Sequence, residues 1–192
     1  PTALSLMAED LVVADLGCGT GDMLVQLAGT AARVIGVDRE PAMLEIAGER
    51  TAGLANVELR LGGLERLPLR DAEVDASLCM LVLHHVEDLD AALREMRRAV
   101  SRRGRVVVVD MASHEREEYR RTMGHVHLGF AERELRARCA AAGLSIASWR
   151  PIAPASDAPE LVAVDQARAE KPPLVPPTTA CKSCGAPIAF LV

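Results

Sequence analysis

Aromatic side chains are almost absent from this chain of 192 residues. They make up 2% of the sequence, and the only examples are Tyr119, Phe130, Trp149 and Phe190. Proteins that bind single-stranded nucleic acids stack successive bases on aromatic rings. The scarcity therefore argues against a stacking platform for nucleic-acid bases or for a broad planar ligand.

Long apolar runs, a secretory signal and an excess of basic charge are missing as well. No apolar stretch approaches the roughly 18 residues that span a bilayer, and no charged-then-apolar segment opens the chain. The net charge of −5 gives no general attraction to nucleic acids or anionic membranes. Cys18, Cys79 and Cys139 are scattered among apolar segments, which favours a reducing compartment over a disulfide framework. We therefore expect a cytoplasmic protein that binds neither membrane nor nucleic acid directly.

Apolar strands alternate with amphipathic helices along most of the sequence. This order predicts an α/β fold, a doubly wound and mostly parallel sheet with helices on both faces. Seven strands are expected, near residues 11–16, 33–37, 57–61, 74–80, 105–111, 144–151 and 160–167. The main domain is expected to cover residues 1–168. A proline-rich linker at 169–180 and a cysteine-containing tail at 181–192 follow it.

The most specific signal lies in residues 12–22. A short apolar strand ends in Asp15, and glycines follow at every second position, at Gly17, Gly19 and Gly21. Glycine tolerates positive φ and lets a ligand approach the backbone closely. A dinucleotide-binding loop needs its third glycine where Asp22 stands, which disfavours a nicotinamide oxidoreductase. The carboxylates of Asp15 and Asp22 suit a ligand with a sulfonium or ammonium group better than a diphosphate.

This loop resembles motif I of class I S-adenosylmethionine-dependent methyltransferases, an acid-x-Gly-x-Gly-x-Gly pattern. Residues 34–38 and 64–86 follow in the order found in the subgroup that includes the quinone-biosynthesis methyltransferases. Residues 123–130 resemble bacterial methyltransferases fused behind a winged-helix domain of the arsenic-repressor type. The chain starts at Pro1 rather than Met, and we expect that something before it has been removed, either by processing or as an upstream domain. The resemblance covers about residues 8–167 and implies a Rossmann-like fold.

The resemblance also implies that S-adenosylmethionine is the cofactor. Asp38 matches the acid that takes the ribose hydroxyls. Gly62 and Gly63 stand where the family commonly has Gly-Asp, so adenine recognition would rest on backbone groups of Gly63 and Leu64 or on Glu65. The cofactor-binding residues implied in this way are Asp15, Gly17, Cys18, Gly19, Gly21, Asp38, Arg39, Gly63, Leu64 and Cys79.

All five histidines are expected on loops near one edge of the sheet. His84 and His85 follow the fourth strand, His114 follows the fifth, and His125 and His127 precede the sixth. Because open α/β sheets bind ligands at the carboxyl ends of their strands, His84 and His85 are the expected catalytic residues, acting as proton acceptors. The alternative is that polar residues simply collect in loops. His125 and His127 are expected to fold over the same rim rather than to bind a metal ion.

Cys181 and Cys184 have the spacing of half a zinc site. A structural zinc ion needs four ligands, and the tail offers no second pair, so the remaining ligands would come from elsewhere. A redox pair and an inert tail are the alternatives. Cys79 is interpreted as a buried residue beside the methyl-transfer site, not as a thiol that holds a metalloid substrate.

These features predict a methyltransferase that uses S-adenosylmethionine and acts on a small-molecule acceptor by in-line methyl transfer. The alternative is a non-catalytic module that senses S-adenosylmethionine or S-adenosylhomocysteine for a transcriptional regulator. The expected partners are a small molecule, a fused or separate winged-helix regulator, and a second copy of the chain.

Overall fold

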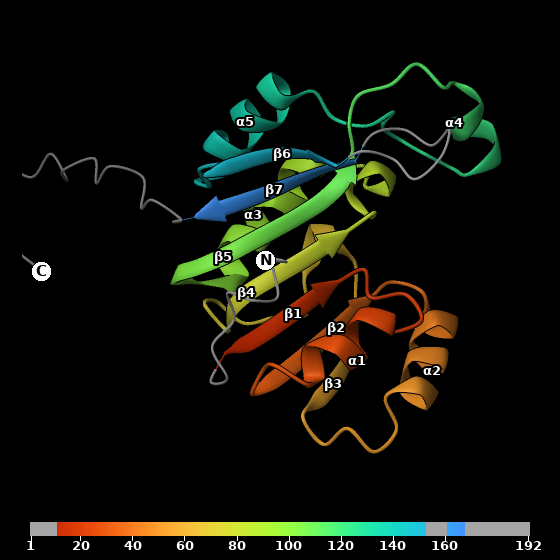
Figure 1. Cartoon of the computed structure of the whole chain (residues 1–192), viewed down its shortest axis with the longest axis vertical. Coiled ribbons are helices and arrows are strands. Elements are labelled where there is room, and N and C mark those ends of the chain that lie inside the picture. The colour runs from red at the N-terminus through yellow and green to blue at the C-terminus, as the bar shows by residue number, and fades with distance from the viewer. Residues whose placement is uncertain (1–10, 153–160, 168–192) are drawn as a thin grey trace, which may run out of the picture.

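The computed structural model describes residues 11–152 and 161–167. These residues form one seven-stranded sheet in the order β3-β2-β1-β4-β5-β7-β6 (Figure 1). The strands are β1 (Val12–Leu16), β2 (Arg33–Asp38), β3 (Val57–Leu61), β4 (Val74–Met80), β5 (Val100–Met111), β6 (Ser148–Ile152) and β7 (Leu161–Ala167). Both pairings of β7 are antiparallel, and the other pairings are parallel. The predicted mostly parallel sheet is therefore confirmed.

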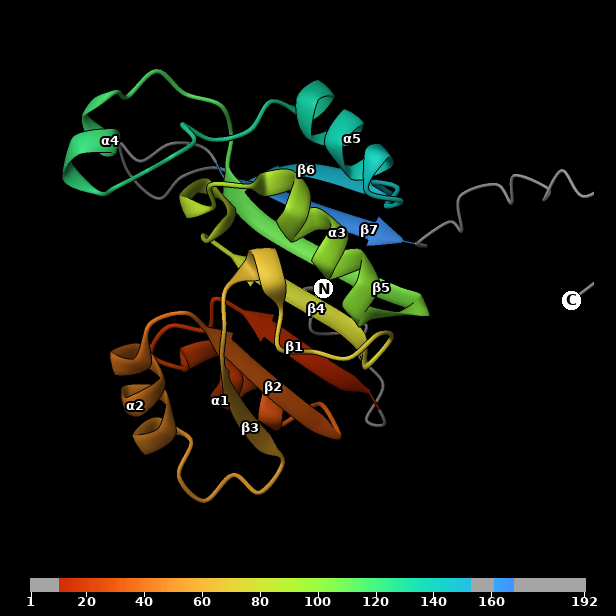
Figure 2. The ribbon, with the colours of Figure 1, turned by 180° about the vertical axis from the view of Figure 1, so that it is seen from behind.

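Helices cover both faces of the sheet, as expected. α1 (Asp22–Ala28) and α2 (Pro41–Arg50) lie in front of the sheet in Figure 1, and α3 (Leu89–Ala99) covers the opposite face (Figure 2). α5 (Glu132–Ala141) packs beside α3. Shorter helices, η2 (Leu64–Arg66), η3 (Leu83–His85) and α4 (Glu118–Thr122), lie in the connections. Every helix in the described part of the chain is too short or too polar to cross a bilayer.

The apolar core has two layers, one on each face of the sheet. Val13 and Val34 pack with Leu24 of α1 and its neighbours. Leu16 and Ile35 belong to the layer that contains α3. Because successive strand side chains point to opposite faces, a strand covered on both faces is apolar without alternation. This burial explains the uninterrupted apolar segments of the sequence.

Two strand boundaries differ from the sequence prediction. β5 begins at Val100, directly after α3, and its pairing with β4 jumps from Val74–Val100 to Ala76–Arg105 across an irregularity. The strand expected at 144–151 begins only at Ser148. The amide of Leu144 instead donates to the carbonyl of Cys139 at 2.8 Å, so this apolar residue closes the end of α5 and does not extend the strand.

Glu73 links the chain before β4 to β2 and β3 through a group of charged hydrogen bonds. Its side chain is only 2% exposed, and Oε1 lies 3.0 Å from Arg33 of β2 and 2.9 Å from Arg60 of β3. The backbone amide of Arg70 donates to Oε2 at 2.7 Å. The hydrogen bond from Arg60 holds the pKa of the Glu73 carboxyl well below its ordinary value. Glu73 therefore fixes the chain before β4 against the edge of the sheet.

Replacing Glu73 with Gln should lower the free energy of unfolding by about 1–3 kcal/mol at neutral pH, because a buried acceptor of charged hydrogen bonds is lost. Urea unfolding measures this difference. Glu58→Gln is the matched control, since Glu58 is 45% exposed and an exposed pair contributes less than about 1 kcal/mol. A lowered pKa means that the contribution is present above the ordinary pKa of Glu and is lost as the pH falls, so the E73Q effect should shrink below about pH 4. Equal effects of E73Q and E58Q would contradict this assignment.

Candidate functional site

The glycine loop after β1 is fastened to the end of β2. The amides of Gly17 and Cys18 donate to the carbonyl of Val37 at 2.7 and 3.0 Å, and the amide of Gly19 donates to Oδ2 of Asp38 at 2.8 Å. Gly17, Gly19 and Gly21 all have positive φ, at 78°, 52° and 84°. Side chains other than glycine rarely adopt that conformation, so the backbone of the loop depends on these residues.

Gly17 is also required by close packing. A Cβ atom at this position would lie 2.4 Å from Cγ2 of Val82, a residue of the segment that follows β4. Around Gly19, by contrast, nothing lies within 4 Å of such an atom. The loop therefore packs tightly against the chain after β4 at Gly17 and leaves open space at Gly19.

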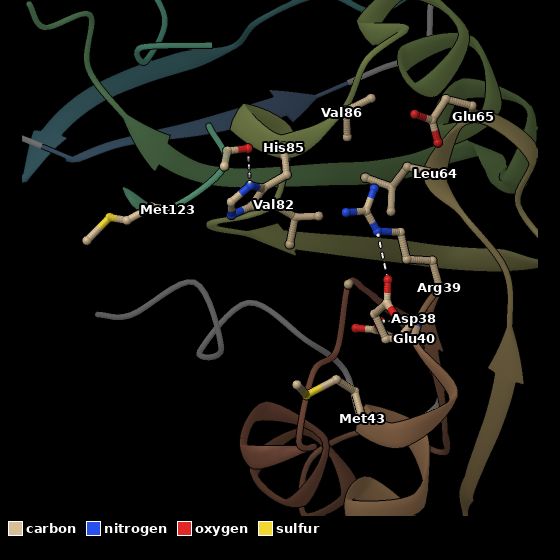
Figure 3. A pocket seen from close by; sticks show the side chains of 12 residues that line it. Asp38, Arg39, Glu40, Met43, Leu64, Glu65, Val82, His85, Val86 and Met123 are labelled. Atoms are coloured by element: carbon tan, nitrogen blue, oxygen red, sulfur yellow. Dashed lines mark hydrogen bonds and ion pairs between the residues drawn. The ribbon is translucent and has the colours of Figure 1, made fainter. Parts of the chain in front are cut away.

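A cavity of about 440 Å³ lies beside this loop, within the usual size range of small-molecule sites. One side of its wall comes from the loop and from the chain after β2, through Gly17, Asp38, Arg39, Glu40 and Met43 (Figure 3). The remaining wall comes from segments after β3, β4 and β5, through Leu64, Glu65, Val82, His85, Val86, Met123 and Gly124. The cavity thus lies at the carboxyl ends of the strands, where open α/β sheets bind ligands.

The acidic character of the cavity comes from residues other than those expected. Asp22 is 77% exposed and forms an ion pair with Arg50 at 2.7 Å, and it does not line the cavity. The acidic residues of the wall are Asp38, Glu40 and Glu65, with Arg39 as the basic one. The wall still carries more acidic than basic groups and favours a cationic ligand, but the argument from Asp22 is wrong.

Asp15 is buried behind the loop. Burial, and secondarily the charge of Asp38, raises the pKa of Asp15 to about 7. Asp15 does not line the cavity. A positively charged ligand in the neighbouring cavity would favour the ionised form of this carboxyl.

The two cysteines near the site are poor nucleophiles. Cys18 is buried, and burial together with the charges of Asp15 and Asp38 raises the pKa of its thiol to about 12. Cys79 has no exposed surface, and burial likewise raises the pKa of its thiol. Because the thiolate is the reactive form, these residues serve as packing groups.

The residues implied by sequence divide into those in the cavity wall and those outside it. Gly17, Asp38, Arg39, Leu64 and His85 line the cavity. Outside the wall lie Asp15, Cys18, Gly19, Gly21, Gly63, Cys79 and His84. Cys181 and Cys184 fall outside the described residues, as do the linker at 169–180 and the tail at 181–192.

His84 is held by a buried acid. Its Nδ1 lies 2.7 Å from Oδ1 of Asp110, and both side chains are almost completely buried. The amide of Met111 donates to the same oxygen at 2.8 Å. Asp110 was not predicted, although its position directly after the apolar run Val106–Val109 is the signal that marks Asp15 and Asp38.

His85 and His125 gather around His84. The centroid of the His84 ring lies 4.1 Å from that of the His85 ring and 4.2 Å from that of the His125 ring. His85 lines the cavity, and its Nδ1 lies 3.3 Å from the carbonyl oxygen of Gly124 (Figure 3). Burial lowers the pKa of both His85 and His125, and the neighbouring histidines lower it further. Both imidazoles are therefore uncharged at neutral pH.

Backbone hydrogen bonds bring the 124–127 segment to this rim. The amides of Val126 and His127 donate to the carbonyl of His84 at 2.9 and 3.0 Å. Nε2 of His127 lies 2.9 Å from the carbonyl oxygen of Val86. The expected position of His125 and His127 beside the rim is confirmed.

A doubly wound sheet, a glycine loop after β1 and an acid at the end of β2 that lines a cavity define a Rossmann-like nucleoside-binding fold. Comparison with known proteins narrows this class. Residues 14–108 match the family model described as a methyltransferase domain. The matched segment, which contains the glycine loop and Asp38, is therefore similar to a methyltransferase domain.

Named relatives support the same family. The chain is 34% identical over 105 residues to the 2-phytyl-1,4-naphtoquinone methyltransferase of Synechococcus elongatus, covering 52% of this chain and 45% of that protein. It is 36% identical over 99 residues to a demethylmenaquinone methyltransferase of Staphylococcus aureus, covering 50% and 41%. The chain thus spans less than half the length of these curated relatives.

Solved structures share the fold across a larger part of the chain. The YcgJ protein of Bacillus subtilis superposes with a TM-score of 0.75 at 21% identity, covering 86% of this chain and 95% of that one. A Burkholderia thailandensis 1,6-didemethyltoxoflavin-N1-methyltransferase with bound S-adenosylhomocysteine gives a TM-score of 0.69 at 18% identity, covering 83% and 72%. At these identities the likeness concerns the fold.

Replacing Gly17 with Ala should abolish ligand binding at the loop, because the new Cβ would meet Val82 and φ is positive. Isothermal titration with S-adenosylmethionine measures the loss. Gly53→Ala is the matched control, since Gly53 also has positive φ but has nothing within 4 Å of the added atom. Undiminished binding by Gly17→Ala would show that the loop is not the cofactor site.

Replacing Asp15 with Asn should remove a pH dependence of stability. A carboxyl whose pKa rises from 3.8 to about 7 on folding favours the folded state in its protonated form, so its stability contribution is lost as the pH rises through that interval. Urea unfolding from pH 4 to pH 8 should show Asp15→Asn gaining stability relative to wild type as the pH rises. A constant difference would contradict the raised pKa.

Proposed function

We propose that this protein transfers a methyl group from S-adenosylmethionine to a small-molecule acceptor. The observation that carries the proposal is the single cavity that joins Gly17 and Asp38 on one side to His85 on the other. Cofactor and acceptor would then meet at the carboxyl edge of the sheet, between the glycine loop and the histidine rim.

The residues of the glycine-loop side fit an aminoacyl nucleoside with a sulfonium group. Each carboxyl oxygen of Asp38 accepts one backbone N–H, from Gly19 and from Glu40, and each retains a second lone pair for a ribose hydroxyl. Glu40 and Glu65 place further acidic groups on the wall, which favours a positively charged ligand. The cradle at Gly17 has no room for a side chain.

Adenine recognition would rest on the segment around η2. Leu64 is buried and lines the cavity, and Glu65 follows it in the wall. Gly63 has extended backbone geometry, with φ −95° and ψ 166°, so no conformational demand for glycine explains the missing acid there. Glu65 is the group that could take its place beside the adenine amino group.

The bound cofactor supplies an electrophilic methyl group on a sulfonium. The protein has to position the acceptor in line with it and to exclude water. Val82 and Val86 give the wall its apolar part next to His85. His85, which lines the cavity, would take the proton of an acceptor that must lose one as it reacts. His84, positioned by Asp110 through the 2.7 Å contact, would support it from behind, with ring centroids 4.1 Å apart.

The acceptor is a small molecule held without aromatic stacking. Among the described residues, none of those that line the cavity is Phe, Tyr or Trp. Two relatives are named as quinone methyltransferases, but a broad quinone ring finds no stacking partner in this wall. A hydroxyl, enol or amine on a compact molecule fits the site better.

A second candidate function is non-catalytic sensing of S-adenosylmethionine or S-adenosylhomocysteine in a transcriptional regulator. Gly63 in place of the family's usual acid favours it, because weaker adenine recognition suits a sensor that must release its ligand. In that function a winged-helix regulator, fused or separate, and a second copy of the chain would be the partners. Zinc binding by Cys181 and Cys184 remains part of this proposal.

The test combines cofactor binding with turnover. S-adenosylmethionine with a labelled methyl group is offered together with a panel of small hydroxylated, enolic and amine acceptors. We expect the His84→Ala, His85→Ala double variant to lose about 10²-fold or more of the transfer rate while cofactor affinity changes little. His114→Ala, which alters a histidine of the same edge, is the control.

The outcomes separate the candidate functions. Cofactor binding without transfer to any acceptor would favour the sensor. Binding of NADH without binding of S-adenosylmethionine would overturn both candidates. Loss of cofactor affinity with normal turnover at saturation would reject the role of the two histidines.

A further inference from the structure

We propose that His84, His85 and His125 bind a divalent transition-metal ion at the rim of the cavity. Among the described residues, these three side chains place one ligand nitrogen each within 4.8 Å of the others. The site differs from the metal site expected at Cys181 and Cys184. The proposal concerns the ion itself and does not depend on methyl transfer.

The tautomers leave nitrogen lone pairs free for an ion. A carbonyl oxygen can only accept a hydrogen bond, so the contact of His85 with Gly124 puts the proton on Nδ1 and leaves Nε2 as a donor of electrons. The contact between Nδ1 of His84 and the Asp110 carboxyl has the same consequence for His84. Histidine ligands of metals commonly hold a carboxylate through their other ring nitrogen, and Asp110 occupies that place.

His125 gives an independent indication of a missing partner. Its side chain is 5% exposed, and Nδ1 is buried with no hydrogen-bond partner. A buried polar atom without a hydrogen-bond partner is energetically unfavourable. An ion among the three rings would satisfy it.

The backbone holds the ligands together before any ion binds. His84 and His85 lie in η3, whereas His125 comes from the segment after α4. Two amides of that segment donate to the carbonyl of His84. Ligands about 2 Å from a zinc ion lie about 3.3 Å apart, so small movements of the His85 and His125 rings toward His84, which Asp110 holds, would complete the site.

The donor set selects the kind of ion. Three imidazoles suit Zn²⁺, Fe²⁺, Ni²⁺ or Cu²⁺, whereas Mg²⁺ and Ca²⁺ prefer oxygen ligands. Three protein ligands leave one position of a tetrahedral ion open, which is typical of catalytic zinc sites. Since His85 lines the cavity, the open position would face it. A histidine nitrogen that holds a metal ion cannot accept a proton at the same time, so if the proposed function holds, the ion would take over from His84 and His85 the activation of a hydroxyl, enol or carboxylate oxygen bound at that position.

The experiment uses the full chain with Cys181→Ser and Cys184→Ser, so that tail thiols cannot contribute. The protein is stripped with a chelator and titrated with Zn²⁺ by calorimetry and with Co²⁺ by visible absorption. We expect one equivalent of each ion to bind, with cobalt bands typical of tetrahedral coordination. No binding of either ion in this background would overturn the proposal.

Variants in the same background identify the ligands. His85→Ala, at a half-buried position, and His125→Ala should reduce binding to background, and Asp110→Asn should weaken it about 10- to 100-fold. His127→Ala is the matched control, because this ring contacts the Val86 carbonyl and is outside the cluster. Thermal unfolding identifies variants that fail to fold.

Cofactor binding is measured on the same samples. Unchanged metal affinity in folded His85→Ala would contradict the metal site, independently of the affinity measured for the cofactor. Bound metal together with no affinity for S-adenosylmethionine would leave the metal site standing and would reject the proposed function. The two proposals therefore fail separately.

Discussion

The site depends on how the ends of β1 and β2 are joined. The carbonyl of Val37 accepts two amides of the glycine loop, and the carboxyl of Asp38 accepts a third. Each such hydrogen bond contributes only about 1 kcal/mol net, but together they fix a loop whose glycines all have positive φ. Once this junction has formed, Gly17 meets Val82, and the ends of β1, β2 and β4 surround one cavity.

This junction concentrates acidic groups where water is largely excluded. Asp15 and Asp38 are both buried beside the loop, and the raised pKa of Asp15 reflects the cost of placing it there. A cationic ligand would relieve part of that cost, so the same electrostatic arrangement that destabilises the empty protein favours a sulfonium compound. Stability and binding oppose one another at this position.

Much of the fold follows from local patterns in the sequence. β1 and β2 are buried along almost their whole length, and their apolar runs mark them clearly as strands covered on both faces. The glycine loop and Asp38 are likewise local, since their spacing places them at the ends of neighbouring strands. The boundaries at Val100 and Ser148 depend on tertiary pairing and on the closure of α5 by Leu144, and such contacts leave no local signal.

In the site, too, some residues follow from local sequence and others depend on tertiary contacts. The position of Asp22 beside Gly21 predicted that it faces the ligand. In the structure Asp22 forms an ion pair with Arg50 of α2, and the sequence around Asp22 does not indicate this partner. Glu40 and Glu65 carry the acidic character of the wall because the chain after β2 and β3 turns toward the loop. Charge near a motif is therefore a weaker guide than charge at the ends of adjacent strands.

The fold also brings together histidines that are distant in sequence, namely His84, His85 and His125. His84 and His125 meet because the chain between them forms α3, β5 and α4 and returns to the edge it left. Asp110 lies at the end of β5 for the same topological reason that Asp15 and Asp38 lie at the ends of β1 and β2. In a parallel sheet the carboxyl ends of the strands meet at one edge, and Asp15, Asp38 and Asp110 all lie at or next to such ends. Two of these acids, Asp15 and Asp38, lie beside the glycine loop, and the third, Asp110, contacts His84 behind the histidines. The edge therefore carries one group of acids for the loop and a separate acid for the histidines.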